Sequence, residues 1–87
     1  MDNSLHKNLP SSPGVYIMQD AAGNILYVGK AKNIRRRVAS YFTKNRQLTA
    51  DKRLMVPRIS KIDHIVTDTE LEALLLETNL IKKHRPK

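Results

Sequence analysis

The chain has 87 residues, a length that suits one small domain with a modest core. Its 16 Lys and Arg against 8 Asp and Glu give a formal net charge of +8. This charge favours a polyanionic partner, nucleic acid before an anionic membrane surface. Cysteine is absent, which excludes disulfides and thiolate–metal sites. No apolar run approaches the roughly 20 residues that span a bilayer, so we expect a cytoplasmic protein with no membrane partner.

A β-hairpin is predicted in the first third of the chain. Two short runs of β-type residues, 14–18 and 25–29, flank the segment 19–24. That segment contains Asp, Gly and Asn, which tolerate the backbone angles of a chain reversal.

The register of this hairpin determines how its tyrosines are arranged. We expect Met18 to pair with Ile25, which places Tyr16 directly opposite Tyr27 on one face of the sheet. The hairpin alone is also consistent with a different role for the two tyrosines, a cross-strand aromatic pair that stabilises the hairpin and takes no part in catalysis.

A first helix is predicted over residues 34–42, with Asn33 as its N-cap. Arg37 lies about 60° around this helix from Ile34, on the border of the buried side. Arg35 and Arg36 lie farther around the helix and point to solvent. We therefore expect Arg37 to be the arginine that is held in place. The buried stripe of the helix is expected to contain Ile34, Val38 and Tyr41.

The middle of the chain is predicted to contain a linker, a helix and a strand. Residues 43–48 are a polar linker, and a second helix is predicted over residues 51–60. Pro57 should end or kink that helix near Met55, because proline lacks the backbone donor that a helix interior needs. A third strand is expected over residues 62–67.

The last helix begins at a capping signal. Thr69 and Glu72 have the spacing of a capping box, and Thr67 with Glu70 is the competing frame.

This last helix is apolar on nearly every side, so we expect it to be buried. One stripe consists of Leu71, Leu74, Leu75, Thr78 and Ile81. A second facet consists of Ala73, Leu76 and Leu80. Glu77 lies between them, and a carboxylate drawn into the protein must meet a cation, a metal or a hydrogen-bond donor. A structural ion pair with Lys or Arg is the simplest of these possibilities.

Two tripeptides carry a family resemblance. Gly14-Val15-Tyr16 and Tyr27-Val28-Gly29 resemble the two halves of the signature of the GIY-YIG nucleases. Within that superfamily the chain is most similar to the N-terminal nuclease domain of the excision-repair protein UvrC. The other stretches that support the resemblance are Leu9-Pro10, Pro13, Lys30-Ala31-Lys32, Ser40-Tyr41-Phe42 and the run from Glu72 to Lys83.

The resemblance implies an α/β fold, a small mainly antiparallel three-stranded sheet flanked by helices. Residues 1–87 would form a single domain, with residues 1–12 as a lead-in, in a fragment of a larger multidomain protein. Family members continue into a Tyr-Asn pair whose Asn lies at the site, whereas this chain ends at Lys87.

The resemblance also implies catalytic roles. Glu77 would be the metal ligand, and Tyr27 would take the proton from the attacking water. Tyr16 would position the scissile phosphate or the water, and Arg37 and Lys30 would stabilise the phosphate and the reacting phenolate. A tyrosine base has an ordinary pKa near 10, so cations beside it are needed to lower that value.

The metal and the nucleic-acid contacts follow from the same residues. Because the sequence lacks the carboxylate cluster of a two-metal nuclease, we expect one divalent ion, Mg²⁺ or Mn²⁺. The residues expected to bind nucleic acid are Lys30, Lys32, Arg35, Arg36 and Arg37.

The function implied is that of a metal-dependent DNA endonuclease that makes the 3′ incision next to a lesion in nucleotide excision repair. Its partners would be damaged double-stranded DNA, UvrB through domains absent from this chain, and the UvrA-dependent pathway, and the domain would be a monomer. One alternative is another GIY-YIG nuclease, of the homing or structure-selective type. The other is a basic module that binds DNA without cleaving it, which would not depend on a divalent ion.

Overall fold

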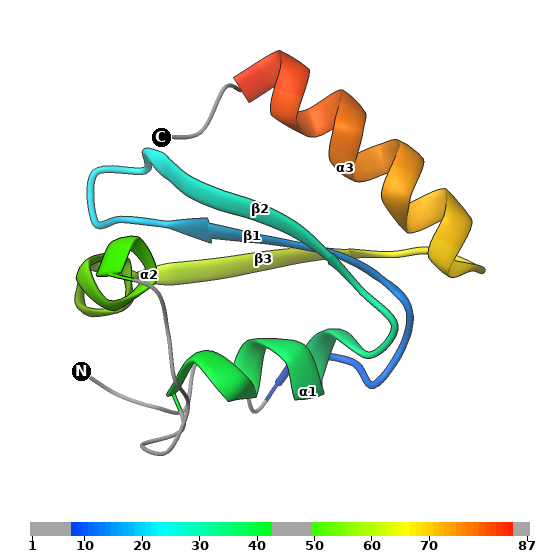
Figure 1. Ribbon diagram of the computed structural model, residues 1–87, viewed down its shortest axis with the longest axis horizontal. Coiled ribbons are helices and arrows are strands. Elements are labelled where there is room, and N and C mark those ends of the chain that lie inside the picture. The colour runs from blue at the N-terminus through cyan, green and yellow to red at the C-terminus, as the bar shows by residue number, and fades with distance from the viewer. Residues whose placement is uncertain (1–7, 43–49, 85–87) are drawn as a thin grey trace.

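The computed structural model describes residues 8–42 and 50–84, and within these ranges three strands form one antiparallel sheet (Figure 1). The strands are β1 (Gly14–Gln19), β2 (Ile25–Ala31) and β3 (Lys61–Val66), in the order β2-β1-β3. The helices in the described residues are α1 (Ile34–Ala39), α2 (Ala50–Met55) and α3 (Glu70–His84), together with the 3₁₀ turns η2 (Ser40–Phe42) and η3 (Val56–Arg58). The expected fold class is confirmed.

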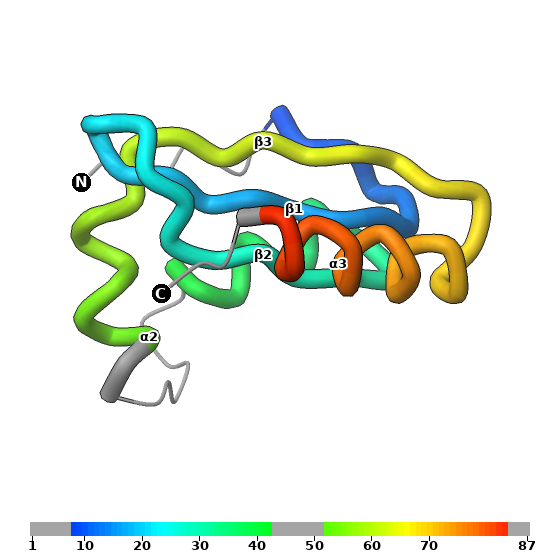
Figure 2. The backbone as a smooth tube through the Cα atoms, turned by 90° about the horizontal axis from the view of Figure 1, so that it is seen from above, coloured from blue at the N-terminus to red at the C-terminus, as the bar shows by residue number. Residues whose placement is uncertain are grey.

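The central strand β1 divides the core into two layers. Because side chains alternate along a strand, Tyr16 and Met18 pack on one face while Val15 and Ile17 pack on the other. Helix α1 covers the first face and α3 covers the second, so the two helices lie on opposite sides of the sheet (Figure 1). Figure 2 shows the three strands side by side, with α2 at the end of the sheet nearest the hairpin turn.

The hairpin forms where it was predicted, but its register differs. A bulge between Met18 and Gln19 makes Gln19 pair with Ile25, and Met18 pairs with Tyr27. Tyr16 therefore lies opposite Gly29, and the prediction that it directly faces Tyr27 is wrong.

The turn between the strands explains the shift. The side chain of Asp20 accepts the backbone N–H groups of Ala22, at 3.0 Å, and Asn24, at 2.9 Å. Gly23 has a φ of 87°, a left-handed conformation that glycine adopts without steric cost. The backbone N–H of Asp20 also donates to the carbonyl of Asn24, at 3.0 Å, so that Gln19 pairs with Ile25 one position later than expected. The bulge adds the second position of the shift.

Helix α1 begins as predicted and ends early. The side chain of Asn33 accepts the backbone N–H of Arg36 at 2.9 Å and so caps the helix. At the other end, the Ser40 hydroxyl donates to the carbonyl of Arg37 at 2.6 Å, a local bond that competes with helix continuation. The chain passes there into the 3₁₀ turn η2, which still buries Tyr41.

The middle segment agrees with the sequence in most respects. Helix α2 ends at Met55, and Pro57 lies in the following turn η3. The predicted continuation of that helix to residue 60 is wrong, because the chain leaves η3 in an extended conformation at Ile59. Strand β3 begins at Lys61, one residue earlier than expected. The predicted linker lies outside the described residues.

Helix α3 starts at the predicted cap. The Thr69 hydroxyl accepts the backbone N–H of Glu72 at 3.1 Å. The competing frame is wrong, because the hydroxyl of Thr67 instead donates to the carbonyl of Thr69 at 2.7 Å.

The expectation that α3 is buried on nearly every side is wrong. Its second facet packs on the sheet: Ala73 is fully buried against β1 and β2, with Leu76 and Leu80 beside it. The other stripe faces outward, with Leu71 66% exposed and Leu75 59% exposed. A three-stranded sheet is too small to cover more than one side of this helix. No helix in the described part of the chain is long and apolar enough to cross a membrane.

Candidate active site

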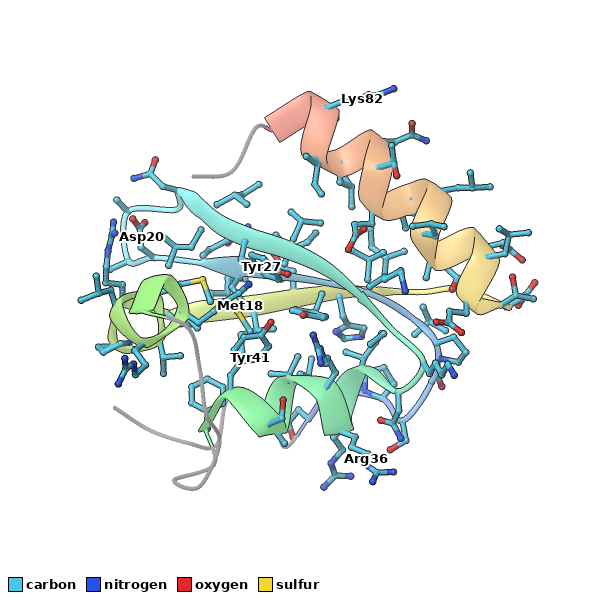
Figure 3. The ribbon with its side chains drawn as sticks, viewed as in Figure 1. Met18, Asp20, Tyr27, Arg36, Tyr41 and Lys82 are labelled. Carbon is cyan, nitrogen blue, oxygen red and sulfur yellow. The ribbon has the colours of Figure 1, made fainter. Side chains whose placement is uncertain are left out.

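Three tyrosines gather on the face of the sheet that α1 covers. Tyr16 comes from β1, Tyr27 from β2 and Tyr41 from η2, and their ring centroids lie 6.0, 6.1 and 6.4 Å apart. Figure 3 shows Tyr27 and Tyr41 in the space between the sheet and α1. The sequence predicted Tyr41 as a core residue and missed its place in this cluster. The signal available was its hydroxyl, since a buried phenol needs a hydrogen-bond partner.

Tyr16 is the enclosed member of the cluster, only 1% exposed. Its hydroxyl oxygen lies 3.0 Å from that of Tyr41. Burial, and then the hydrogen bond with Tyr41, raise the pKa of Tyr16 far above its ordinary value. Tyr16 is therefore held in its neutral, protonated form.

Gly29 leaves the room that these rings occupy. A Cβ atom at this position would overlap the phenol of Tyr16 and approach the ring of Tyr27. The glycine of the second tripeptide is thus required by side-chain packing against the two tyrosines.

Arg37 joins the cluster from α1, as its helical position predicted. A hydrogen bond with the Tyr16 phenol raises the pKa of Arg37, and its guanidinium lies 6.0 Å from the centroid of the Tyr41 ring. Arg35 is exposed, and Arg36 points away from the sheet (Figure 3).

Glu77 reaches the outer edge of the sheet from α3. Its Oε2 accepts the backbone N–H of Lys30 at 2.8 Å. Because β2 is an edge strand, this outward N–H has no neighbouring strand to pair with. Within the described residues no Lys or Arg lies within ion-pair distance of Glu77. A structural ion pair, the simplest alternative for this carboxylate, is therefore not what holds Glu77 in the described structure.

The side chain of Lys30 lies away from the tyrosines. Its ammonium is 3.4 Å from Oε1 of Glu70, in the first turn of α3. Among the described residues, the cation in contact with the Tyr27 ring is Lys52 of α2, whose Nζ lies 3.1 Å from the ring centroid. The sequence missed Lys52, because nothing local fixes where α2 lies against the sheet.

A basic cleft of about 510 Å³ opens at the end of β2 and along α1. Lys30 and Arg37 line it, whereas Glu77 and the three tyrosines are not among its lining residues. It contains four of the five residues predicted to bind nucleic acid; Arg35 is the one that does not line it. Lys32 is paired loosely with Glu70, at 4.0 Å. The lining residues are Lys30, Ala31, Lys32, Asn33, Arg36, Arg37, Ser40 and Glu70.

A family model for the UvrC-like GIY-YIG domain matches residues 12–87 of this chain. The chain belongs to the UvrC-like GIY-YIG domain family. UvrABC system protein C of Symbiobacterium thermophilum is 60% identical over 79 residues, which cover 91% of this chain and 13% of that protein. The corresponding protein of Geobacter metallireducens is 54% identical over 86 residues, which cover 99% of this chain and 14% of that protein. The chain thus spans a small part of the length of these relatives.

Solved structures of UvrC-like GIY-YIG domains have the same fold. The crystal structure of the N-terminal endonuclease domain of UvrC from Thermotoga maritima matches with a TM-score of 0.83 at 37% identity. The match covers 100% of this chain and 97% of that chain. That domain is bound to its catalytic divalent cation, magnesium.

The donor groups of this UvrC-like domain suit one weakly held divalent ion. Among the described residues, no group of three or more His, Asp or Glu side chains gathers to enclose a metal. Glu77 offers one carboxylate, fixed through Oε2 by the Lys30 backbone, while its Oε1 has no hydrogen bond in the described part of the chain. Mg²⁺ accepts such a site, because it readily keeps several waters and takes its other oxygens from a substrate phosphate.

Proposed function

We propose that this chain is a metal-dependent endonuclease domain that hydrolyses a DNA phosphodiester. The observation that carries the proposal is the position of Glu77, a half-buried carboxylate fixed by a backbone donor and without an ion-pair partner among the described residues. A half-buried carboxylate with one oxygen lacking a protein donor costs free energy. Its retention against Lys30, a residue that lines the basic cleft, points to a bound cation.

Tyr27 is the group that takes the proton from the attacking water. Its side chain is only partly buried, and a cation lies over its ring. Tyr16 is poorly suited to this role, since its pKa is raised by burial and by its bond with Tyr41. A group held protonated cannot act as the general base near neutral pH.

Tyr16 acts through Arg37. Because its hydroxyl is enclosed and bonded to both Tyr41 and Arg37, Tyr16 holds the guanidinium at the wall of the cleft. Arg37 then faces the phosphate, where a planar guanidinium can hold two oxygens and offset developing charge.

The other cations of the cleft bind the DNA backbone. Lys32 and Arg36 are exposed and line the same cleft as Arg37. Lys30 contributes its backbone N–H to Glu77. Its side chain is 37% exposed, and its ammonium exchanges Glu70 for a phosphate. A divalent ion on Glu77 would supply charge neutralisation at the phosphate and at the leaving oxygen.

For the whole protein, we propose the 3′ incision next to a lesion in nucleotide excision repair. The chain's relatives are named as component C of the UvrABC system, which supports this setting. Damaged double-stranded DNA would be delivered through UvrA and UvrB, with UvrB contacted by domains outside this chain. The domain itself would act as a monomer in the cytoplasm.

A basic module that only binds DNA is the second candidate, favoured by the net charge of +8. Such a module would lose affinity as salt rises, because its phosphate contacts displace counterions. It would also be indifferent to Glu77 and to divalent ions.

The test uses the full-length parent protein with UvrA and UvrB on an end-labelled duplex that carries one lesion. Glu77→Gln keeps the side-chain volume and removes the charge, and we expect the 3′ incision to fall by about 100-fold or more. Glu72→Gln, an exposed carboxylate in the first turn of the same helix, is the matched control and should cleave normally.

A duplex already nicked on the 3′ side measures the other incision independently, and that incision should persist in both variants. If Glu77→Gln makes both incisions at the wild-type rate, Glu77 is a structural residue and the proposed site is wrong.

A further inference from the structure

The ammonium of Lys52 lies over the face of the Tyr27 ring. Its Nζ is 3.1 Å from the centroid of the Tyr27 ring and 5.6 Å from that of Tyr41. Lys52 is half-buried on α2, the short helix at the end of the sheet (Figure 2). It comes from a segment to which neither the signature tripeptides nor the family resemblance assigns a role.

An ammonium over an aromatic face is attracted to the neutral ring, and this attraction grows when water is excluded. When Tyr27 loses its proton, the same ring carries a full negative charge, and the attraction becomes an ion pair. The ammonium therefore favours the phenolate over the phenol.

The other groups that face Tyr27 do not provide this charge as directly. Tyr16 and Tyr41 contribute neutral phenols that are bonded to each other. The guanidinium of Arg37 is hydrogen-bonded first to Tyr16, and its charge acts on Tyr27 only as a weaker electrostatic contribution. The ammonium of Lys30, the cation that the sequence placed beside Tyr27, is paired with Glu70.

We propose that Lys52 is a positioning residue for the nuclease reaction, which fixes the ring of Tyr27 and stabilises its phenolate. Tyr27 first loses its phenolic proton to solvent. In the step itself, the phenolate oxygen takes a proton from the attacking water and the water oxygen bonds to the phosphorus. The scissile P–O bond then breaks, and the leaving oxygen takes a proton from solvent. Lys52 acts through the Tyr27 ring. This inference rests on the proposed function, because it assumes that Tyr27 is the base.

The test compares single-turnover 3′ incision by full-length protein with UvrA and UvrB, from neutral to alkaline pH. Lys52→Met removes the charge and keeps the length of the side chain, and we expect a rate about tenfold lower near pH 7. The difference in rate between Lys52→Met and wild type should shrink as pH rises. At alkaline pH the Tyr27 phenol loses its proton to hydroxide even without the ammonium of Lys52. Lys52→Arg keeps a cation over the ring and should cleave within about twofold of wild type.

Arg53→Met is the matched control, since it removes an exposed cation from the next position of the same helix. It should change the rate by about twofold at most, equally at every pH. Lys52→Gln supplies a second uncharged variant. Incision of the pre-nicked duplex on the 5′ side measures whether each variant is folded and bound.

Tyr27→Phe tests the assignment of Tyr27 as the base separately from the role of Lys52. If it abolishes 3′ incision and Lys52→Met cleaves like Arg53→Met at every pH, the role of Lys52 is overturned and the proposed function stands. If Lys52→Met lowers the rate of 3′ incision by the same factor at every pH, the role of Lys52 at Tyr27 is also overturned. A lost phosphate contact would lower the rate in this pH-independent way. Normal incision by Tyr27→Phe overturns both the base assignment and the role of Lys52.

Discussion

The hydroxyl oxygens of Tyr16 and Tyr41 lie 3.0 Å apart in a buried hydrogen bond that joins the central strand to the turn after α1. The two residues are 25 positions apart, so the bond ties the hairpin to the helix that carries Arg37. Removing one hydroxyl leaves the other buried without that partner. We expect Tyr41→Phe to lower the free energy of unfolding by about 1–2 kcal/mol, measured by denaturant unfolding.

Tyr16→Phe should cost more than Tyr41→Phe, because it also removes the partner of Arg37. The double variant should cost less than the sum of the two single ones, since neither phenol is then left unpaired. Strict additivity would mean that the two hydroxyls do not interact in solution.

Gly29 should tolerate no side chain. The Cβ of Gly29→Ala overlaps the Tyr16 phenol, so we expect a loss of about 1–3 kcal/mol in the free energy of unfolding. Gly23→Asn is the comparison, since no atom lies within 4 Å of an added Cβ there and asparagine accepts a left-handed conformation. Denaturant midpoints that coincide for the two variants would contradict the packing of Tyr16 on Gly29.

The buried side of α3 should be more sensitive to substitution than its exposed side. Ala73 is fully buried against the sheet, so Ala73→Leu should lower the free energy of unfolding by about 1–3 kcal/mol. Leu75 is 59% exposed, so Leu75→Gln should change it by about 0.5 kcal/mol at most. Thermal unfolding of both variants measures the difference, and a larger loss for Leu75→Gln would mean that the outer stripe is covered.

Asp20 should make the hairpin sensitive to acid. Hydrogen bonds from Asn24, first from its backbone and then from its side chain, hold the pKa of Asp20 below its ordinary value, and Ala22 adds another. A folded-state pKa below the unfolded one gives a stability that is present above the unfolded value and is lost as pH falls through the folded one. Asp20→Asn should therefore flatten the acid limb of stability against pH, and an unchanged limb would rule out this contribution.

The sequence predicted the elements that depend on local chemistry. Asn33 and Thr69 mark two helix starts, because a side-chain oxygen satisfies backbone donors a few residues away. Pro57 marks the end of α2 at Met55. The position of Arg37 on the inner border of its helix also follows from local geometry.

The tertiary structure decided what depends on contacts between distant segments. The bulge at Gln19 set the strand register, and the width of the sheet determined which side of α3 is buried. Lys52 met Tyr27 because α2 lies against the end of the sheet, an arrangement that no local pattern specifies. Caps and prolines act within a few residues, so the sequence alone located the helix starts. Packing depends on the whole chain, so only the structure located the cation over Tyr27.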